Sequence, residues 1–121
     1  MNLIVVRESL ERAVKSKHWQ WMPGMLIYFP DDKVSARLVD VDHDDLAYAI
    51  PDVTDPATIG WLLYLVRKAY NDTSIYTRMG EGKAMGDLYA IPRWEVKGRL
   101  CNSWGYPLEG LALIDALEGA P

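Results

Sequence analysis

The residues with the most chemical potential form a short acidic run between positions 40 and 45. Its members are Asp40, Asp42, His43, Asp44 and Asp45. Alternate aspartates can direct hard oxygen ligands toward one cation. The spacing does not fit a calcium-binding EF-hand loop, because the sixth position from Asp40 is Asp45 rather than glycine and the twelfth is Pro51 rather than glutamate. We therefore expect a solvated turn and no metal site, with cation binding as the alternative.

A glycine-rich stretch, Gly80–Gly86, could in principle hold phosphate, because glycine lets backbone N–H groups approach an anion. It does not match the dinucleotide-binding pattern GxGxxG, since its third glycine comes one position late. It does not match the phosphate-loop pattern GxxxxGK[ST] either, since no serine or threonine follows a Gly-Lys pair. We predict a flexible hairpin tip and no bound cofactor.

Cys101 is the only cysteine, so one chain has no disulfide and no cysteine-based zinc site. With His18 or His43 it could form a nucleophile and a base, but neither the order nor the context matches a known local signature. A lone cysteine in a strand-like segment is usually a small core residue. No standard catalytic constellation is present, so we predict that the protein is not an enzyme.

The composition is typical of a single globular domain that spans residues 1–121. Half of the residues are hydrophobic and 25% are charged, and the chain is long enough to build a core without disulfides or metal ions. No run of about 18 apolar residues is present to cross a membrane, and the N-terminal apolar run is too short for a signal peptide. With a single cysteine, these features favour a cytoplasmic location and no membrane partner.

The formal net charge is -4, and residues 1–60 carry ten acidic side chains against six basic ones. A nucleic-acid-binding protein usually has a basic excess that displaces counterions from phosphates, so we predict no nucleic-acid partner. The acidic half could mimic phosphate, but a solubilising surface is the preferred interpretation.

The best-defined element is a helix from Pro56 to Tyr70. Asp55 can accept a hydrogen bond from the first free backbone N–H groups, and Pro56 stands where a missing N–H costs nothing. Apolar residues then recur at the i, i+3, i+4, i+7 spacing of one helical face. The predicted buried face consists of Ile59, Leu62, Leu63, Val66 and Ala69.

Periodicity and turn chemistry predict the elements on either side. Further helices are expected at residues 3–17 and 107–118, and strands at residues 25–29, 34–41, 46–50, 74–79, 87–91 and 94–101. We expect Pro51 to end the third strand and Pro92 to interrupt the later pairing. The predicted fold class is α+β in the order α-βββ-α-ββ(β)-α, with one antiparallel sheet of about five or six strands and three helices.

Trp61, Tyr64 and Lys68 form a second stripe on the central helix, at i, i+3 and i+7. Large aromatic side chains beside a cation are the composition of an interface hot spot, so these three residues are the candidate interface. The alternative is that another part of the chain covers them. A helix that is apolar nearly all the way round slightly favours that alternative.

Three segments carry a resemblance to known proteins: Trp21–Met25, the motif Pro-Asp-Val-Thr-Asp-Pro-Ala-Thr within Ile50–Gly60, and the closing segment Leu108–Glu118. They resemble small uncharacterised proteins of bacteriophages and prophages, in the manner of the phage ABA-sandwich group. The resemblance implies an α+β phage accessory protein, and it brings no established catalytic residues.

Our leading hypothesis is a non-enzymatic phage or prophage protein that binds a host protein in the host cytoplasm, such as a component of an antiviral defence system. A homodimer is compatible with the same stripe. One alternative is a small-ligand-binding protein or small enzyme whose pocket lies near the Trp19/Trp21 turn and the Gly80–Gly86 loop. Another is a virion or assembly component.

Overall fold

The computed structural model describes residues 3–42, 44–84 and 89–121. The helices there are α1 (Leu3–Ala13), the short 3-10 helix η1 (Asp44–Tyr48), α2 (Pro56–Tyr70) and α3 (Glu109–Glu118). The strands are β1 (Leu26–Phe29), β2 (Val34–Arg37), β3 (Ile50–Pro51), β4 (Tyr76–Ala84), β5 (Tyr89–Lys97) and β6 (Asn102–Tyr106). The α+β class is as predicted, and the order of elements roughly matches the prediction.

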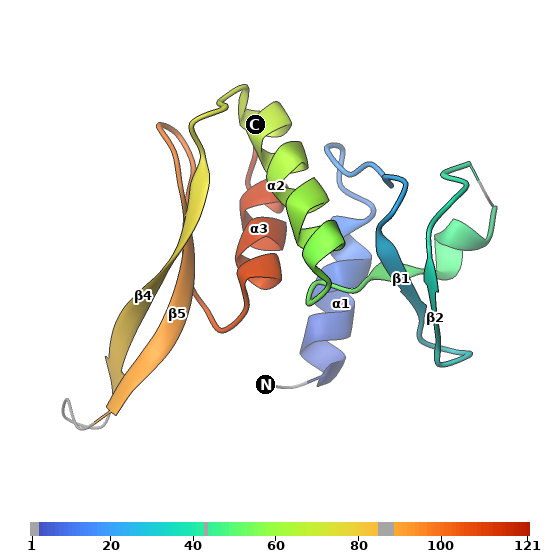
Figure 1. Cartoon of the computed structure of the whole chain (residues 1–121), viewed down its shortest axis with the longest axis horizontal. Helices are drawn as coiled ribbons and strands as arrows, with labels where there is room; N and C mark the ends of the chain where they lie inside the picture. The colour runs from blue at the N-terminus through green and yellow to red at the C-terminus, as the bar shows by residue number, and fades with distance from the viewer. Residues whose placement is uncertain (1–2, 43, 85–88) are drawn as a thin grey trace.

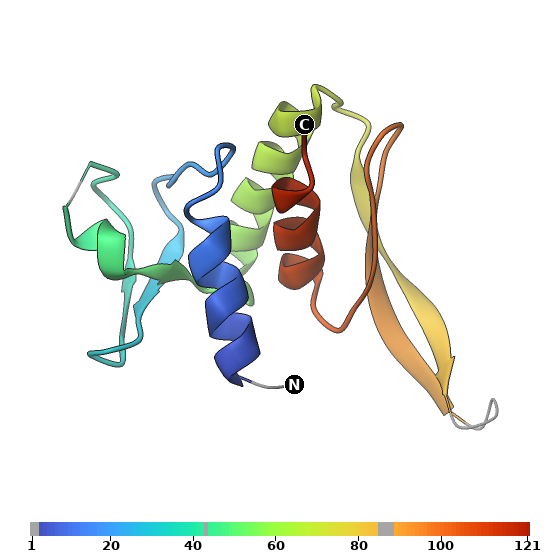
Figure 2. The same ribbon diagram turned by 180° about the vertical axis from the view of Figure 1, so that it is seen from behind.

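The strands form two separate antiparallel sheets, and the helices α1, α2 and α3 lie between them (Figure 1). One sheet has the order β2-β1-β3 and the other has the order β4-β5-β6. The view from behind shows the same arrangement (Figure 2). Helix α3 packs on β5, β6 and α2, while α1 contacts α3 and β3. The single sheet of five or six strands that we predicted is therefore wrong, because α2 separates the two groups of strands.

The core centres on α2 and α3. Leu62 and Val66 of α2 are fully buried, as predicted. Thr58 and Leu65 are buried as well, whereas Leu63 and the other two residues of the predicted face, Ile59 and Ala69, are only partly covered. The buried face is thus rotated slightly from the prediction. A helix with apolar residues on nearly every side does not define one face by periodicity alone.

One element of the N-terminal half differs from its predicted form. Residues 46–50 do not make a strand: η1 ends at Tyr48, and only Ile50–Pro51 pairs with β1. Leu46 and Ala49 point into the core, and this spacing of three suits a 3-10 turn rather than a strand. Pro51 is the last residue of β3, so the third strand ends at this proline as predicted, and Pro51 itself pairs with Ile27.

Three other elements of the N-terminal half are shorter than predicted. Strand β1 begins at Leu26 rather than Met25, and β2 ends at Arg37 rather than at position 41. Helix α1 ends at Ala13 instead of position 17, since the following N–H groups of Lys15 and Ser16 bond three residues back in tighter turns.

In the C-terminal half, a long hairpin replaces the predicted glycine loop. Strand β4 continues through Gly80 to Ala84, while Met85 and Gly86 lie outside the described residues. Strand β5 also passes through Pro92, which is opposite Glu81, so the proline does not interrupt the pairing. The predicted strand at 94–101 is divided, because β5 ends at Lys97 and a turn leads into β6 at Asn102.

A bulge at Gly105 decides which way the aromatic residues of β6 face. Trp104 pairs with Glu95 and Tyr106 pairs with Trp94, so Gly105 is an extra residue between them, with a φ of +96° that suits glycine. Trp104 is 62% exposed, whereas Tyr106 packs against the core. Burial, followed by a hydrogen bond with Asp115, raises the pKa of Tyr106 to about 12.

Helix α3 begins later than predicted, at Glu109, because Leu108 is extended and Pro107 precedes it. Gly110 lies in the first turn and is buried against Val53. Gly110 lowers the helix propensity of α3, but its lack of a side chain allows α3 to approach the segment before α2.

Candidate functional site

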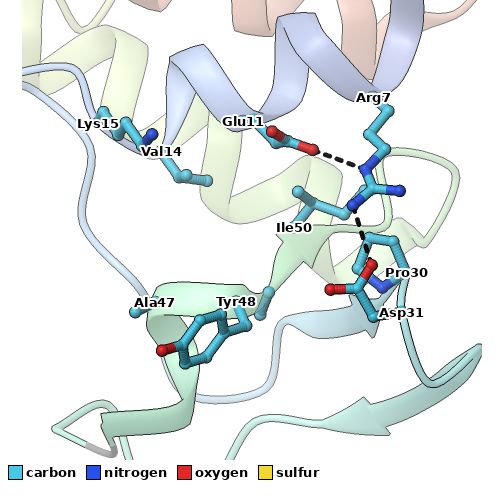
Figure 3. A pocket seen from close by; sticks show the side chains of 10 residues that line it. Arg7, Glu11, Val14, Lys15, Pro30, Asp31, Ala47, Tyr48 and Ile50 are labelled. Atoms are coloured by element: carbon cyan, nitrogen blue, oxygen red, sulfur yellow. Dashed lines mark hydrogen bonds and ion pairs between the residues drawn. The ribbon is translucent and has the colours of Figure 1, made fainter. Parts of the chain in front are cut away.

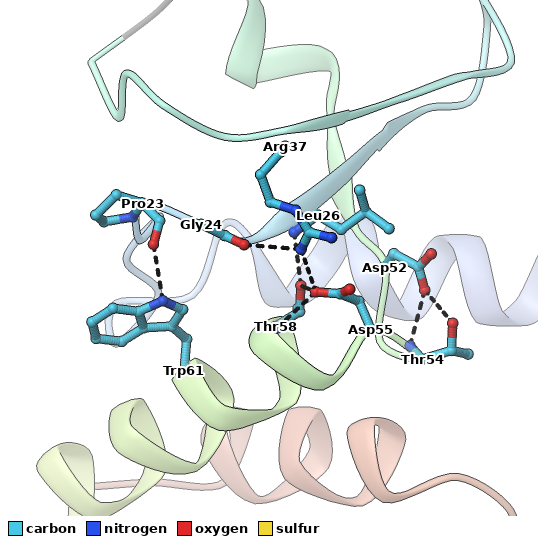
Figure 4. A network of polar contacts seen from close by, with 9 residues as sticks. All are labelled: Pro23, Gly24, Leu26, Arg37, Asp52, Thr54, Asp55, Thr58 and Trp61. Atoms are coloured by element: carbon cyan, nitrogen blue, oxygen red, sulfur yellow. Dashed lines mark hydrogen bonds and ion pairs between the residues drawn. The ribbon is translucent and has the colours of Figure 1, made fainter.

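A polar network fixes the first turn of α2 against the β1–β2 hairpin (Figure 4). The Oδ2 atom of Asp55 accepts hydrogen bonds from the backbone N–H and the hydroxyl of Thr58, both at 3.0 Å. Nη1 of Arg37 donates to the same oxygen at 2.7 Å and to the carbonyl oxygen of Gly24 at 3.0 Å. Arg37, followed by Thr58, lowers the pKa of Asp55. Asp55 is therefore the helix cap that the sequence predicts. It also forms an ion pair with Arg37, which the sequence does not reveal.

Thr58 extends this network into the core. Its hydroxyl oxygen accepts a hydrogen bond of 2.8 Å from the backbone N–H of Leu26, at the start of β1. The side chain is fully buried, so both hydroxyl contacts lie away from water. This hydrogen bond fixes the position of α2 along β1. It therefore also sets the position of the residues one helical turn later.

Trp61 lies one turn beyond Thr58 and is held at both sides of its ring. Its indole N–H donates to the carbonyl oxygen of Pro23 at 3.0 Å (Figure 4). The ring meets that of Tyr64 edge to face, with centroids 5.5 Å apart. Trp61 is half-buried, Tyr64 is 46% exposed and Lys68 is exposed. The three candidate residues share one side of α2, and the turn before β1 covers part of it.

A hollow of about 300 Å³ adjoins this stripe at Lys68. Lys68 lines it together with Lys17, His18, Trp19, Gln20, Leu65 and Ala69. Trp19 packs edge to face on Trp21, with ring centroids 5.1 Å apart, and its buried indole nitrogen has no hydrogen-bond partner among the described residues. The sequence indicated the two-tryptophan turn but not Lys17 or Gln20, because nothing in a single sequence shows that this turn folds beside α2.

The structure does not bring that turn to the glycine-rich segment, as the ligand-pocket hypothesis required. Gly80–Ala84 belong to β4, in the sheet on the far side of α3, whereas Trp19 lies beside α2 (Figure 1). No pocket between the two was found among the described residues. The predicted pocket therefore reduces to the hollow at Trp19.

Cys101 is buried in the core, where burial raises the pKa of its thiol. The groups that act on it are Tyr70, Asp115 and Asp72, and no described histidine is among them. The ring of His18 is hydrogen-bonded to the carbonyl oxygen of Pro121 at 2.7 Å, and His43 lies outside the described residues. Among the described groups that act on the thiol there is thus a tyrosine but no histidine that could serve as its base.

In the described part of the acidic run, residues 41–42 form a turn and Asp44 begins η1. The backbone N–H of Asp42 donates to the Oδ1 atom of Asp40 at 3.0 Å, which is a local turn contact. Within the described ranges, no three His, Cys, Asp or Glu side chains are arranged to hold a metal ion. A membrane-crossing helix is likewise absent from the part of the chain that the structure describes.

A second exposed surface, which the sequence analysis missed, is the outer face of the β4-β5-β6 sheet. Tyr76 is 46% exposed and Trp104 62% exposed, and Arg78 forms an ion pair with Glu95 between them. The period-2 alternation of β4 places Tyr76 and Arg78 on one face. Trp104 joins them because it pairs with Glu95, which in turn pairs with Arg78, and a single sequence does not show this register.

Comparison of the chain with protein-family profiles, with curated proteins and with solved structures finds no match. The geometry of these surfaces is therefore the basis for any assignment of function.

Proposed function

We propose that this protein is a non-enzymatic accessory protein of a bacteriophage or prophage that binds a host protein through the aromatic stripe, which comprises Trp61, Tyr64 and Lys68. The observation that carries the proposal is that Trp61 is fixed on two sides, by the Pro23 carbonyl and by the ring of Tyr64, while Tyr64 and Lys68 remain exposed. The phage origin rests on the motif within Ile50–Gly60.

A fixed aromatic pair is well suited to binding because its conformational freedom is already restricted. Ordering a mobile side chain on binding costs about 0.5 to 1.5 kcal/mol, and Trp61 has already lost that freedom in the free protein. Tryptophan and tyrosine are also the residues most enriched among interface hot spots. The stripe therefore supplies contact area without a large ordering cost.

The charge beside the stripe indicates the chemistry of the partner surface. Lys68 and Lys17 both line the adjoining hollow, and no carboxylate is among its lining residues that the structure describes. A partner that presents a carboxylate next to an apolar surface would satisfy both features. A component of a host defence system with such a surface is the partner class that the phage origin favours.

The proposal is tested with the native protein as bait in a lysate of the candidate host. Tyr64→Ala combined with Lys68→Ala should abolish recovery of a specific partner. Tyr76→Ala is a matched control, because Tyr76 and Tyr64 are both 46% exposed but lie on different surfaces. With the purified partner, loss of a hot-spot side chain should weaken binding by at least about tenfold.

Two results would contradict the proposal. One is that no specific partner is recovered at micromolar bait concentration. The other is a partner that the Tyr64→Ala/Lys68→Ala protein binds as tightly as the native protein does. Sedimentation of the purified native and variant proteins separately tests whether the stripe instead mediates a homodimer.

The hollow at Trp19 supports a second candidate function, the binding of a small ligand. A buried indole N–H without an acceptor among the described residues is rare and costs about 1 to 3 kcal/mol. A ligand oxygen would satisfy it once the side chains that cover the nitrogen move aside. A thermal-shift panel of carboxylates and nucleotides tests this, since a ligand at 100 times its dissociation constant stabilises the fold by about 2.7 kcal/mol. Trp19→Phe should remove any shift that depends on the N–H, and a flat panel would retire this candidate.

A further inference from the structure

An open groove of about 550 Å³ lies between the turn of the β1–β2 hairpin and η1. Half of its lining is apolar or aromatic and half is acidic. The lining residues are Phe29, Asp31, Asp32, Val34, Asp45 and Tyr48. Among the lining residues that the structure describes, none is basic. The groove thus combines aromatic walls with carboxylates in one place.

The apolar walls of this groove are unusually exposed. Tyr48 is 75% exposed and Val34 is 51% exposed. Tyr48 stands at the end of η1, whose Leu46 is buried in the core, so the helix holds the tyrosine outward. Tyr48 and Asp31 also line a neighbouring hollow of about 140 Å³ on the side of α1 (Figure 3). Such adjacent exposed apolar side chains are typical of a binding surface.

The groove also lies in the segment that accounts for the charge of the chain. Residues 31–45 contain six aspartates against one lysine and one arginine, an excess of four negative charges that equals the formal net charge of -4 for the whole chain. The arginine, Arg37, is directed to Asp55 and the Gly24 carbonyl instead. The lysine, Lys33, does not line the groove.

A cation of another element, Arg7, reaches the groove at Asp31, and Lys15 lines the neighbouring hollow. Arg7 of α1 donates to Asp31 at 3.2 Å, but it is shared with Glu11, to which it donates at 2.6 Å (Figure 3). Glu11 therefore offsets the positive charge that Arg7 brings to Asp31. The surface retains an acidic character that would attract a basic partner.

We propose that this groove binds a basic segment of another protein by accepting an arginine side chain. The flat guanidinium would stack on the exposed ring of Tyr48 and donate hydrogen bonds to the surrounding carboxylates, a combination for which arginine is better suited than lysine. The groove shares no lining residue with the aromatic stripe, so this inference stands apart from the proposed function and can fail without affecting it.

The test uses the full-length protein and a fluorescently labelled peptide of glycine and serine with three spaced arginines. Fluorescence anisotropy should show saturable binding that weakens with added salt. A peptide with citrulline at the three positions keeps the shape but loses the charge, and it should bind at least about tenfold more weakly. A lysine peptide should fall between the two.

Variants of the protein assign the binding to the groove. Tyr48→Ala should weaken binding of the arginine peptide by roughly three- to tenfold, and Tyr48→Phe should retain it, because the ring rather than the hydroxyl makes the contact. Asp32→Asn should also weaken binding, and more than Glu8→Gln does. Glu8 is an exposed carboxylate on α1 that lines neither hollow beside Tyr48, so its variant removes the same charge elsewhere.

Circular dichroism should show that these exposed substitutions leave the fold intact. The proposal is overturned if the citrulline peptide binds as well as the arginine peptide. It is also overturned if Tyr48→Ala has no effect, if Asp32→Asn and Glu8→Gln weaken binding equally, or if millimolar arginine peptide does not bind.

Discussion

A Cβ atom added to Gly110 would lie 2.2 Å from the carbonyl oxygen of Val53, a distance that real side chains do not tolerate. This close approach joins α3 to the segment between β3 and α2. Alanine is the better helix former by about 1 kcal/mol, yet overpacking against backbone costs about 1 to 3 kcal/mol or more. We therefore expect Gly110→Ala to lower the free energy of unfolding, as measured by urea denaturation.

Gly60→Ala should have the opposite effect. Gly60 is exposed on α2, and nothing lies within 4 Å of the position that its Cβ would occupy. The helix should gain roughly 0.5 to 1 kcal/mol of stability from the substitution. Urea denaturation of the two variants side by side separates propensity from packing, and a stabilised Gly110→Ala protein would contradict the contact with Val53.

Thr58→Val should destabilise the protein although it preserves the shape of the side chain. The substitution removes the acceptor of the Leu26 N–H and leaves that buried donor unpaired, which costs about 1 to 3 kcal/mol. Thr58→Ser keeps the hydroxyl and should cost less. Chemical denaturation ranks the three proteins, and equal stability of the native and valine proteins would exclude a role for the hydroxyl bond.

Asp72 should make the stability of the fold dependent on pH in the acid range. Hydrogen bonds from Ser74, followed by the backbone N–H of Arg99, lower the pKa of Asp72 from 3.8 to about 2. A lowered pKa stabilises the folded protein fully above about pH 4, and this contribution is lost as the pH falls toward 2.

Asp72→Asn should therefore be less stable than the native protein near neutral pH. The difference in unfolding free energy should shrink as the pH is lowered from about 4 to about 2. Thermal or urea unfolding at several pH values measures this difference. A gap of constant size across that range would show that the charge of Asp72 is not responsible.

Cys101 should report on opening of the core. Its side chain is only 2% exposed, and burial raises the pKa of the thiol, so both access and thiolate formation are limited in the folded state. A disulfide reagent should label the native protein at least roughly a hundredfold more slowly than the protein in denaturing guanidinium chloride. Rapid labelling of the native protein would contradict its place in the core.

Much of the local structure was predictable because its causes are local. Asp55 and Pro56 define the start of α2 by capping chemistry alone, and the structure places the helix from Pro56 to Tyr70 as predicted. The division into two sheets was not predictable in this way. Alternation identifies a strand, but it does not show which other strands share its sheet.

The candidate stripe was only partly predictable for the same reason. The i, i+3, i+7 spacing places Trp61, Tyr64 and Lys68 on one side of a helix, and the structure keeps them there. The carbonyl of Pro23 and the hollow at Trp19 come from a segment about 40 residues away, and their approach depends on tertiary packing. No spacing rule within one segment contains that information.

The separation of the two sheets also has a consequence for how the chain folds. All strands of one sheet come from residues 26–51, and all strands of the other come from residues 76–106. Among the described residues, strand pairing therefore does not join the two halves, and each sheet forms by closing loops within its own half, for which the entropy cost is modest. The contacts between residues far apart in the sequence are then mainly side-chain contacts. They form when α1 and α3 pack against the rest of the core. We expect folding to be rapid, with the docking of these terminal helices as its last step.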